Sequence, residues 1–221
     1  MAMFTTMGTP MQNEAILTLV QWLSPAYPVG AFAYSHGLEW AVEAQDVRDS
    51  ATLSAWLEDV LRHGAGWCDA LFLAAAYRAD DPTVVDSIAH AFAPSAERLQ
   101  ETTLQGAAFS KTTGQIWGTV LPALTYPVAL GHSARLHDLP LELTLQLYLQ
   151  AFMANLVTAG MRLIPLGQTE GQILIKFHTP LCVAIAEDAI EGTLDNLSST
   201  AFLSDIASMK HEQQYSRIFR T

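Results

Sequence analysis

The sequence is poor in charge, and its basic residues are not clustered. Charged residues make up 15% of its 221 residues, and 22 acidic against 11 basic side chains give a formal net charge of −11. Nucleic-acid binding needs grouped lysine and arginine to neutralise phosphates, so this balance argues against it. Half of the chain is hydrophobic, which excludes a disordered protein. So few charges favour surface that is covered by partners or by a second copy of the chain.

Cysteines and long hydrophobic runs are also scarce. Cys68 and Cys182 stand alone, outside any disulfide or zinc spacing, so we expect no disulfide framework and a reduced, cytoplasmic setting. Residues 1–7 carry no positive charge and no long apolar run, so we expect no secretory signal. The most apolar stretch, 141–166, is interrupted by four polar residues, Gln146, Gln150, Asn155 and Arg162. A membrane span is therefore not expected.

Motifs for catalysis are missing as well. Residues 106–112 come nearest to a phosphate-binding loop, but they lack its second glycine and are one residue short. A helical zinc-protease motif would start at His211, yet Tyr215 stands where its second histidine is required. No serine-nucleophile elbow of the G-x-S-x-G kind occurs. We therefore expect a protein that is not an enzyme, with no catalytic residues, no metal ligands and no stably bound cofactor.

Hydrophobic spacing predicts helices almost throughout. Apolar residues recur at three- and four-residue intervals, without the alternation of strands or a βαβ rhythm. The sequence thus predicts one all-α domain over residues 1–221, with roughly eight to ten helices. The expected helical spans, in chain order, are 13–23 with Asn13 as N-cap, 38–42, 50–77, a helix from Pro82, 94–117, 140–165, 172–191 and 198–211.

Some boundaries stay open at this stage. Gly64 and Gly66 can bend or split the long helix over 50–77. A short helical piece is expected between Pro122 and Pro127, and residues 167–171 are expected as a turn. Residues 173–175 also suit a short strand, and Pro180 is expected to interrupt the helix that follows.

Three segments need more than a helical core to explain them. Residues 25–39 place aromatic side chains and glycines in a proline-bounded loop, a pattern that suits a binding surface or a hydrophobic staple onto the next helix. Residues 165–172 combine two glycines with two glutamines between apolar helices, which suits a tight turn. Residues 210–220 hold three of the 11 basic residues beside Tyr215, Ile218 and Phe219. This last composition favours a partner-binding tail over docking on its own domain.

Together these segments resemble the UreF family of urease accessory proteins. The resemblance rests on Ser24-Pro25-Ala26-Tyr27-Pro28-Val29-Gly30-Ala31-Phe32 followed by Ser35-His36-Gly37-Leu38-Glu39. It continues through Asn155, Pro165-Leu166-Gly167-Gln168 and Gly171-Gln172, and ends in Met209, His211-Glu212 and Tyr215-Ser216-Arg217-Ile218-Phe219. The three blocks keep the family's order and span nearly the whole chain. Residues 50–150 share the helical texture of the family more than its motifs.

The resemblance implies a cytoplasmic all-α homodimer that acts as a chaperone scaffold. Members of the family join UreD (UreH in some species) and the GTPase UreG, and the complex delivers nickel to apo-urease without a stable nickel site on this subunit. In the family the C-terminal tail becomes ordered when UreD binds, and it helps to recruit UreG. The partner-binding residues that the resemblance implies are Phe32, Tyr34, His36, Glu39, Lys210, His211, Glu212, Tyr215, Arg217 and Phe219.

Two alternatives remain beside this scaffold hypothesis. The protein could regulate GTP hydrolysis by UreG, with an arginine supplied by Arg217, Arg220 or Arg162. It could also bind nickel itself, and the candidate ligands are four histidines, His36, His132, His137 and His211.

Overall fold

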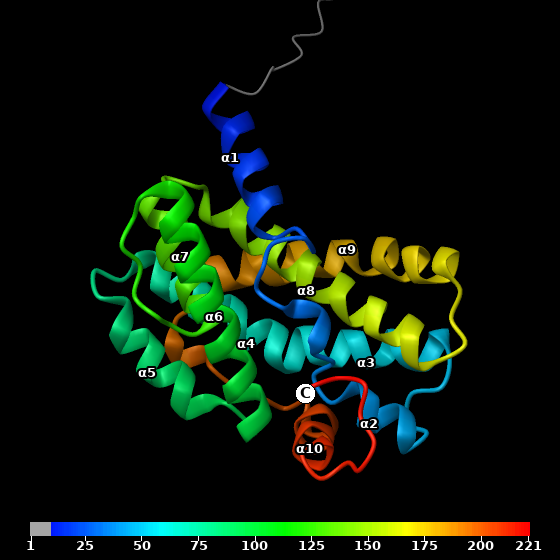
Figure 1. Cartoon of the computed structure of the whole chain (residues 1–221). Helices are drawn as coiled ribbons and strands as arrows, with labels where there is room; N and C mark the ends of the chain where they lie inside the picture. The colour runs from blue at the N-terminus through cyan, green and yellow to red at the C-terminus, as the bar shows by residue number, and fades with distance from the viewer. Residues whose placement is uncertain (1–9) are drawn as a thin grey trace, which may run out of the picture.

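The computed structural model describes residues 10–221, and Figure 1 shows their arrangement. Residues 1–7, in which no secretory signal is expected, lie outside this range. Within the described part of the chain there are ten α-helices and two short 3-10 helices, with no strand. The prediction of an all-α fold of eight to ten helices is therefore confirmed.

One helix runs through the middle of the molecule and is covered on nearly every side. This is α4, which packs against α3, α5, α7, α8 and α9. Small residues allow the close approach: a Cβ on Gly131 of α7 would overlap the carbonyl group of Leu73 in α4. We call α3, α4, α7, α8 and α9 the helical body. Their bounds are Ser50–His63, Ala65–Arg78, Tyr126–Leu136, Leu141–Leu163 and Gln168–Glu191.

The remaining helices surround this body. Helix α1 projects away from it, α5 and α6 cover one side, and α2 and α10 pack together at the end that also holds the C-terminus (Figure 1). Their bounds are Pro10–Trp22, Pro82–Phe92, Ala96–Trp117, Leu38–Glu43 and Phe202–His211, and the two 3-10 helices η1 and η2 span Ala31–Ala33 and Leu194–Asn196. Among the described residues, none of the helices combines the length and the apolar character that crossing a membrane requires.

Several predicted boundaries are wrong by a few residues. The helix over 50–77 is two helices, because the chain breaks at Gly64, one of the two glycines at which a split was expected. Helix α1 begins at Pro10, so Asn13 lies inside it, and Asp49 rather than Ser50 caps α3 by accepting a hydrogen bond from the Thr52 amide. Both helix starts lie within a few residues of the expected ones.

The region around α7 and α9 departs further from expectation. No helix lies between Pro122 and Pro127; instead Pro127 lies in the first turn of α7, where its missing N–H costs nothing. Helix α9 starts at Gln168 and passes through Pro180, so neither the strand at 173–175 nor the interruption is found. Packing against α3, α4 and α8 stabilises α9 over its whole length, and this outweighs the single backbone hydrogen bond lost at the proline.

Candidate partner-binding site

The proline-bounded loop ends in a turn whose shape depends on glycine. His36 and Gly37 both adopt left-handed backbone conformations, with φ values of 53° and 77°. Gly37 faces α10, where an added Cβ would lie 2.6 Å from the Ser208 amide nitrogen. This close approach brings α2, which begins at Leu38, against α10.

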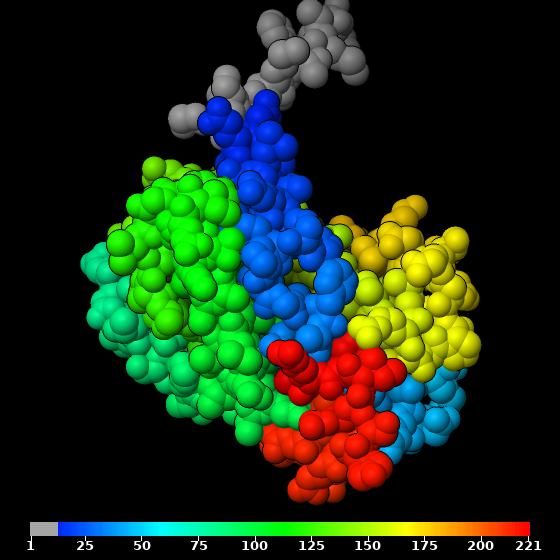
Figure 2. Space-filling model, viewed as in Figure 1, coloured from blue at the N-terminus to red at the C-terminus, as the bar shows by residue number. Residues whose placement is uncertain are grey.

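The C-terminal residues run back over this loop. We call residues 210–221 the C-terminal segment; it lies beside α2 and α10 in Figure 2. The Arg220 amide donates a hydrogen bond to the Ala33 carbonyl oxygen at 2.7 Å. The Ser35 amide and hydroxyl both donate to the Thr221 carbonyl oxygen at 2.6 Å. The segment therefore docks on its own domain in this structure, as one of the two interpretations of its sequence allowed.

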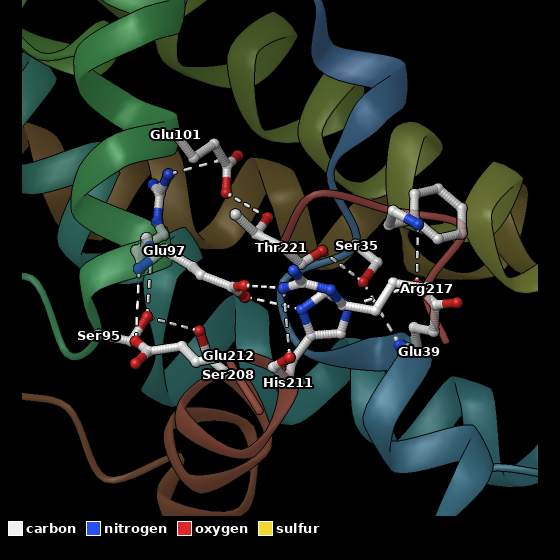
Figure 3. A network of polar contacts seen from close by, with 12 residues as sticks. Ser35, Glu39, Ser95, Glu97, Glu101, Ser208, His211, Glu212, Arg217 and Thr221 are labelled. Carbon is white, nitrogen blue, oxygen red and sulfur yellow. Dashed lines mark hydrogen bonds and ion pairs between the residues drawn. The ribbon is translucent and has the colours of Figure 1, made fainter. Parts of the chain in front are cut away.

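Three buried glutamates hold the segment in place, and Figure 3 shows them with their partners. We call Glu39 of α2 with Glu97 and Glu101 of α6 the carboxylate floor. The two oxygens of Glu39 accept hydrogen bonds from the Ile218 and Phe219 amides at 2.7 and 2.8 Å.

The other two members of the floor contact side chains of the segment. Glu97 binds the Arg217 guanidinium at 2.6 Å and His211 Nδ1 at 2.7 Å. Glu101 accepts a hydrogen bond from the Thr221 hydroxyl at 3.1 Å. The segment is thus held by directional, charge-assisted contacts at both ends and in the middle.

A second charged layer lies beneath the floor. Arg98 bridges Asp69 at 2.6 Å and Glu101 at 3.4 Å, and the His36 ring contacts Glu101 at 3.0 Å. Burial alone would raise the pKa of Glu101, but the positive charges of His36 and Arg98 outweigh it and hold that pKa below its usual value. Glu101 therefore stays ionised and able to accept from the segment.

The outward side of the segment is basic and apolar. Tyr215 is fully exposed, Ile218 is 62% exposed, and Phe32 in the proline-bounded loop is about half exposed. The Arg162 guanidinium lies 4.3 Å from the centre of the Phe219 ring and so joins α8 to the segment by a cation–π contact. With Lys210, Arg217 and Arg220, four of the 11 basic residues of an acidic chain lie in or against this segment.

Comparison with known proteins gives the family of the chain. The family model described as UreF matches residues 47–176. The urease accessory protein UreF of Ruegeria pomeroyi is 60% identical over 218 residues, which cover 97% of this chain and 100% of the relative.

The chain belongs to the UreF family.

Other UreF relatives show the same nearly complete coverage. The protein of Roseobacter denitrificans is 51% identical over 213 residues, which cover 96% of each chain. The protein of Rhodopseudomonas palustris is 47% identical over 225 residues, which cover 95% of each chain. These alignments extend beyond residues 47–176, the part that the UreF family model matches. The relatives are named as accessory proteins of urease, not as ureases.

The residues that the UreF resemblance implied divide into two groups. Phe32, Lys210, Glu212, Tyr215 and Arg217 keep surface exposed, while the others are buried. The buried ones are Tyr34, His36, Glu39, His211 and Phe219. In this arrangement the buried group shapes and holds the C-terminal segment. Of the exposed group, Arg217 and Glu212 also bind α6, while Phe32, Lys210 and Tyr215 lie at the surface.

Sequence reasoning missed the α6 side of this UreF site. Glu97, Glu101 and Gln105 follow one another at intervals of four residues, with Arg98 beside them, and all four are buried. A polar stripe at helical spacing was the available signal, but such a stripe usually marks a solvated helix face. Glu212 also serves α6, because its carboxylate accepts a hydrogen bond from the Ala96 amide at 2.8 Å at the start of that helix.

The histidines and cysteines of this UreF-family chain form no metal centre or nucleophile in the described residues. No group of three or more histidine, cysteine, aspartate or glutamate side chains is placed to hold a metal ion there. Burial lowers the pKa of His132 and of His137, both of which lie on or next to α7, away from the C-terminal segment. Burial also raises the pKa of Cys68 to about 12, so its thiol stays protonated.

Proposed function

We propose that this protein is a scaffold for nickel insertion into apo-urease and that its C-terminal segment is the docking surface for UreD (UreH) and UreG. In this proposal the protein works in the cytoplasm as a homodimer, and nickel is handled by the assembled complex. Membership of a family of urease accessory proteins supports the general role. The observation that carries the docking surface is the exposed basic and apolar side of residues 210–221.

Charge supports the choice of this surface. The chain as a whole carries a formal net charge of −11, yet Arg162, Lys210, Arg217 and Arg220 lie in or against one short segment. Arginine and tyrosine are the residue types that contribute most to interface affinity. A local positive patch on an acidic protein also orients an acidic partner as it approaches.

The mode of attachment supports a conditional role. The segment is held on the carboxylate floor mainly by hydrogen bonds and ion pairs, which a partner's polar groups can replace. Segments that are ordered by such contacts can be exchanged between arrangements when a partner binds. Binding of one partner can therefore change the arrangement of the segment that a second partner meets.

The test compares full-length protein with a chain ending at Met209. We expect light-scattering masses on a sizing column to show a dimer for both, a larger complex of full-length protein with UreD, and further growth with UreG. Removal of residues 210–221 should abolish the step to UreG. Unchanged assembly of the truncated chain with both partners would contradict the proposed surface.

A point substitution sharpens this test. Tyr215 is fully exposed, so Tyr215→Ala changes the surface of the C-terminal segment with little effect on folding. Val120 is 96% exposed in the linker before α7, and Val120→Ala is the matched control. We expect Tyr215→Ala to weaken partner binding at least tenfold, which is about 1.4 kcal/mol, and Val120→Ala to leave it unchanged.

The same proteins test the alternative role as a regulator of GTP hydrolysis. In this arrangement Arg217 is bound to Glu97, and Arg162 lies over Phe219. A regulator that supplies an arginine would lose stimulated hydrolysis by UreG in Arg217→Lys while binding stays unchanged. A scaffold would lose binding and hydrolysis together, or neither.

A further inference from the structure

One histidine of the C-terminal segment is enclosed between two carboxylates. The His211 ring is fully buried, with Nδ1 2.7 Å from Glu97 and Nε2 3.3 Å from Glu39. Glu39 belongs to α2 and Glu97 to α6, so the ring joins two helices that are far apart in the sequence (Figure 3).

The other partners of these carboxylates are all donors. Glu39 accepts from the amides of Ile218 and Phe219, and Glu97 accepts from Arg217. Backbone N–H and guanidinium groups cannot accept a proton or a hydrogen bond here. The ring therefore donates from both nitrogens, or it shares a proton with one carboxylate. In either arrangement the cluster holds one proton more than a neutral ring with two ionised carboxylates would hold.

The charges around the His211 ring also favour one additional proton on this cluster. Glu39 faces it from α2, Glu97 faces it from α6, and Arg217 approaches Glu97 from the segment. The nearby carboxylates have other partners, since Glu212 binds the start of α6 and Glu43 binds the Gln214 side chain. Two negative charges thus meet one fixed positive charge, and the protonated ring supplies the second. A buried cluster is stable when its charges are paired in this way.

We propose that docking of the C-terminal segment takes up a proton on the His211–carboxylate cluster, so that docking weakens as the solution becomes more basic. In the free segment the imidazole is in water and is mostly neutral at about pH 7.5 and above. The docked state then binds more protons than the free state. Low pH favours docking, and rising pH favours release, with a limit of about tenfold per pH unit for one proton.

The consequence for assembly rests on the proposed function. A partner that binds the docked segment binds less tightly at higher pH, because part of its binding energy is used to recover the docked arrangement. The proton-linked docking itself belongs to the isolated chain and can be measured without a partner.

The experiment follows the amides of Ile218 and Phe219 in the full chain by hydrogen exchange. Their protection factors report docking after correction for the intrinsic pH dependence of exchange, and the Tyr148 amide in α8 is the control. Between about pH 6 and pH 9 we expect the two factors to fall several-fold more than the control, by up to about tenfold per unit at the basic end. Factors that change no more than the control would overturn the proposal.

Two variants and one spectrum make the result specific. His211→Gln and Glu97→Gln each remove one ionisable member of the cluster, so each should flatten the pH dependence. The nitrogen-15 spectrum of the wild-type ring tests the proton directly, even if a variant fails to fold. We expect both ring nitrogens of His211 to carry a proton in the docked protein at about pH 7. One bare nitrogen in a wholly docked protein, without a proton shared with Glu97, would overturn the proposal.

Partner binding is measured separately on the same samples. If docking depends on pH but UreD and UreG ignore the segment, the proposed function fails and the proton linkage stands. If the partners need the segment but its protection is independent of pH, the proton linkage fails and the proposed function stands.

Discussion

The helical body and the C-terminal segment are held by different kinds of contact. In the body, helices approach until backbones meet, as at Gly131 of α7 against Leu73 of α4. In the segment, Phe219 is the buried apolar anchor, and most other contacts are hydrogen bonds or ion pairs to Glu39, Glu97 and Glu101.

This difference separates permanent structure from exchangeable structure. Close packing of apolar groups depends on shape and loses its energy when any one element moves. Hydrogen bonds to carboxylates can be replaced by water or by a partner's donors at modest net cost. The body therefore fixes where the carboxylate floor lies, while the segment can respond to solution conditions and to binding.

Arg98 joins the two regions, and its loss should have the largest effect. Arg98→Leu leaves the buried Asp69 without its ion-pair partner and removes one of the two positive groups beside Glu101. We expect urea denaturation to show a loss of about 3–5 kcal/mol in the free energy of unfolding. Arg62→Leu is the control, because its exposed pair with Glu58 should contribute within about 0.5 kcal/mol. Equal effects would remove the distinction between buried and surface charge.

Disturbed packing in the helical body should have the second largest effect on the free energy of unfolding. Gly131→Ala places a methyl group against the Leu73 carbonyl, where two helices would have to separate. We expect a loss of about 2–3 kcal/mol in the free energy of unfolding, measured by thermal or urea denaturation. The methyl group of Gly167→Ala meets only the Glu170 carboxylate oxygen, at an ordinary contact distance of 3.5 Å, and should change stability by less than about 1 kcal/mol. A tolerated Gly131→Ala would show that the body adapts as easily as the segment.

Loss of a charge from the carboxylate floor should destabilise the C-terminal segment more than the helical body. Glu39→Gln keeps the shape of the side chain but removes the charge that the Ile218 and Phe219 amides bind. We expect the free energy of opening at these two amides, measured by hydrogen exchange, to fall by about 1.5–3 kcal/mol. The free energy of opening at the α4 amides should fall less. Glu187→Gln, at an exposed position of α9, is the matched control. A uniform loss across the molecule would mean that body and segment unfold together.

The cation–π contact should give the smallest change. Arg162→Gln removes the guanidinium over Phe219 but leaves the carboxylate floor intact. We expect a loss of about 0.5–1 kcal/mol, seen as a few-fold fall in protection of the Phe219 amide. Arg162→Lys should retain part of it, because the charge stays while the planar group is lost. A larger effect than that of Glu39→Gln would reverse the order of the two contacts.

The helices were easier to predict from the sequence than the contacts between them. The expected spans 50–77, 94–117 and 140–165 correspond to α3 with α4, to α6 and to α8. Apolar spacing indicated the first of these, whereas the buried face of α6 is mostly polar. The missed α7 is short and rich in small residues, so it carries little periodic signal. The helix over 172–191 was predicted, but the interruption expected at Pro180 is not found, because tertiary packing overrides a local rule.

The candidate site shows the same division. The proline-bounded loop and the basic, aromatic C-terminal residues stood out as unusual composition. Glu97 and Glu101 did not stand out, because an acidic residue on a helix is usually exposed to solvent and its burial is not expected from the sequence. Nothing in the local sequence indicated that Ser35 or Glu39 would meet residues some 180 positions further along the chain.

The all-α class, the lack of known catalytic motifs and the concentration of basic and aromatic residues near residue 215 follow from the order of the amino acids alone. These properties are local: they depend on spacing and composition within a helix or a loop. The tertiary structure alone decided that the C-terminal segment docks on its own domain and that His211 lies between Glu39 and Glu97. Those contacts join residues more than 110 positions apart, and only the packing of α2, α6 and α10 brings them together.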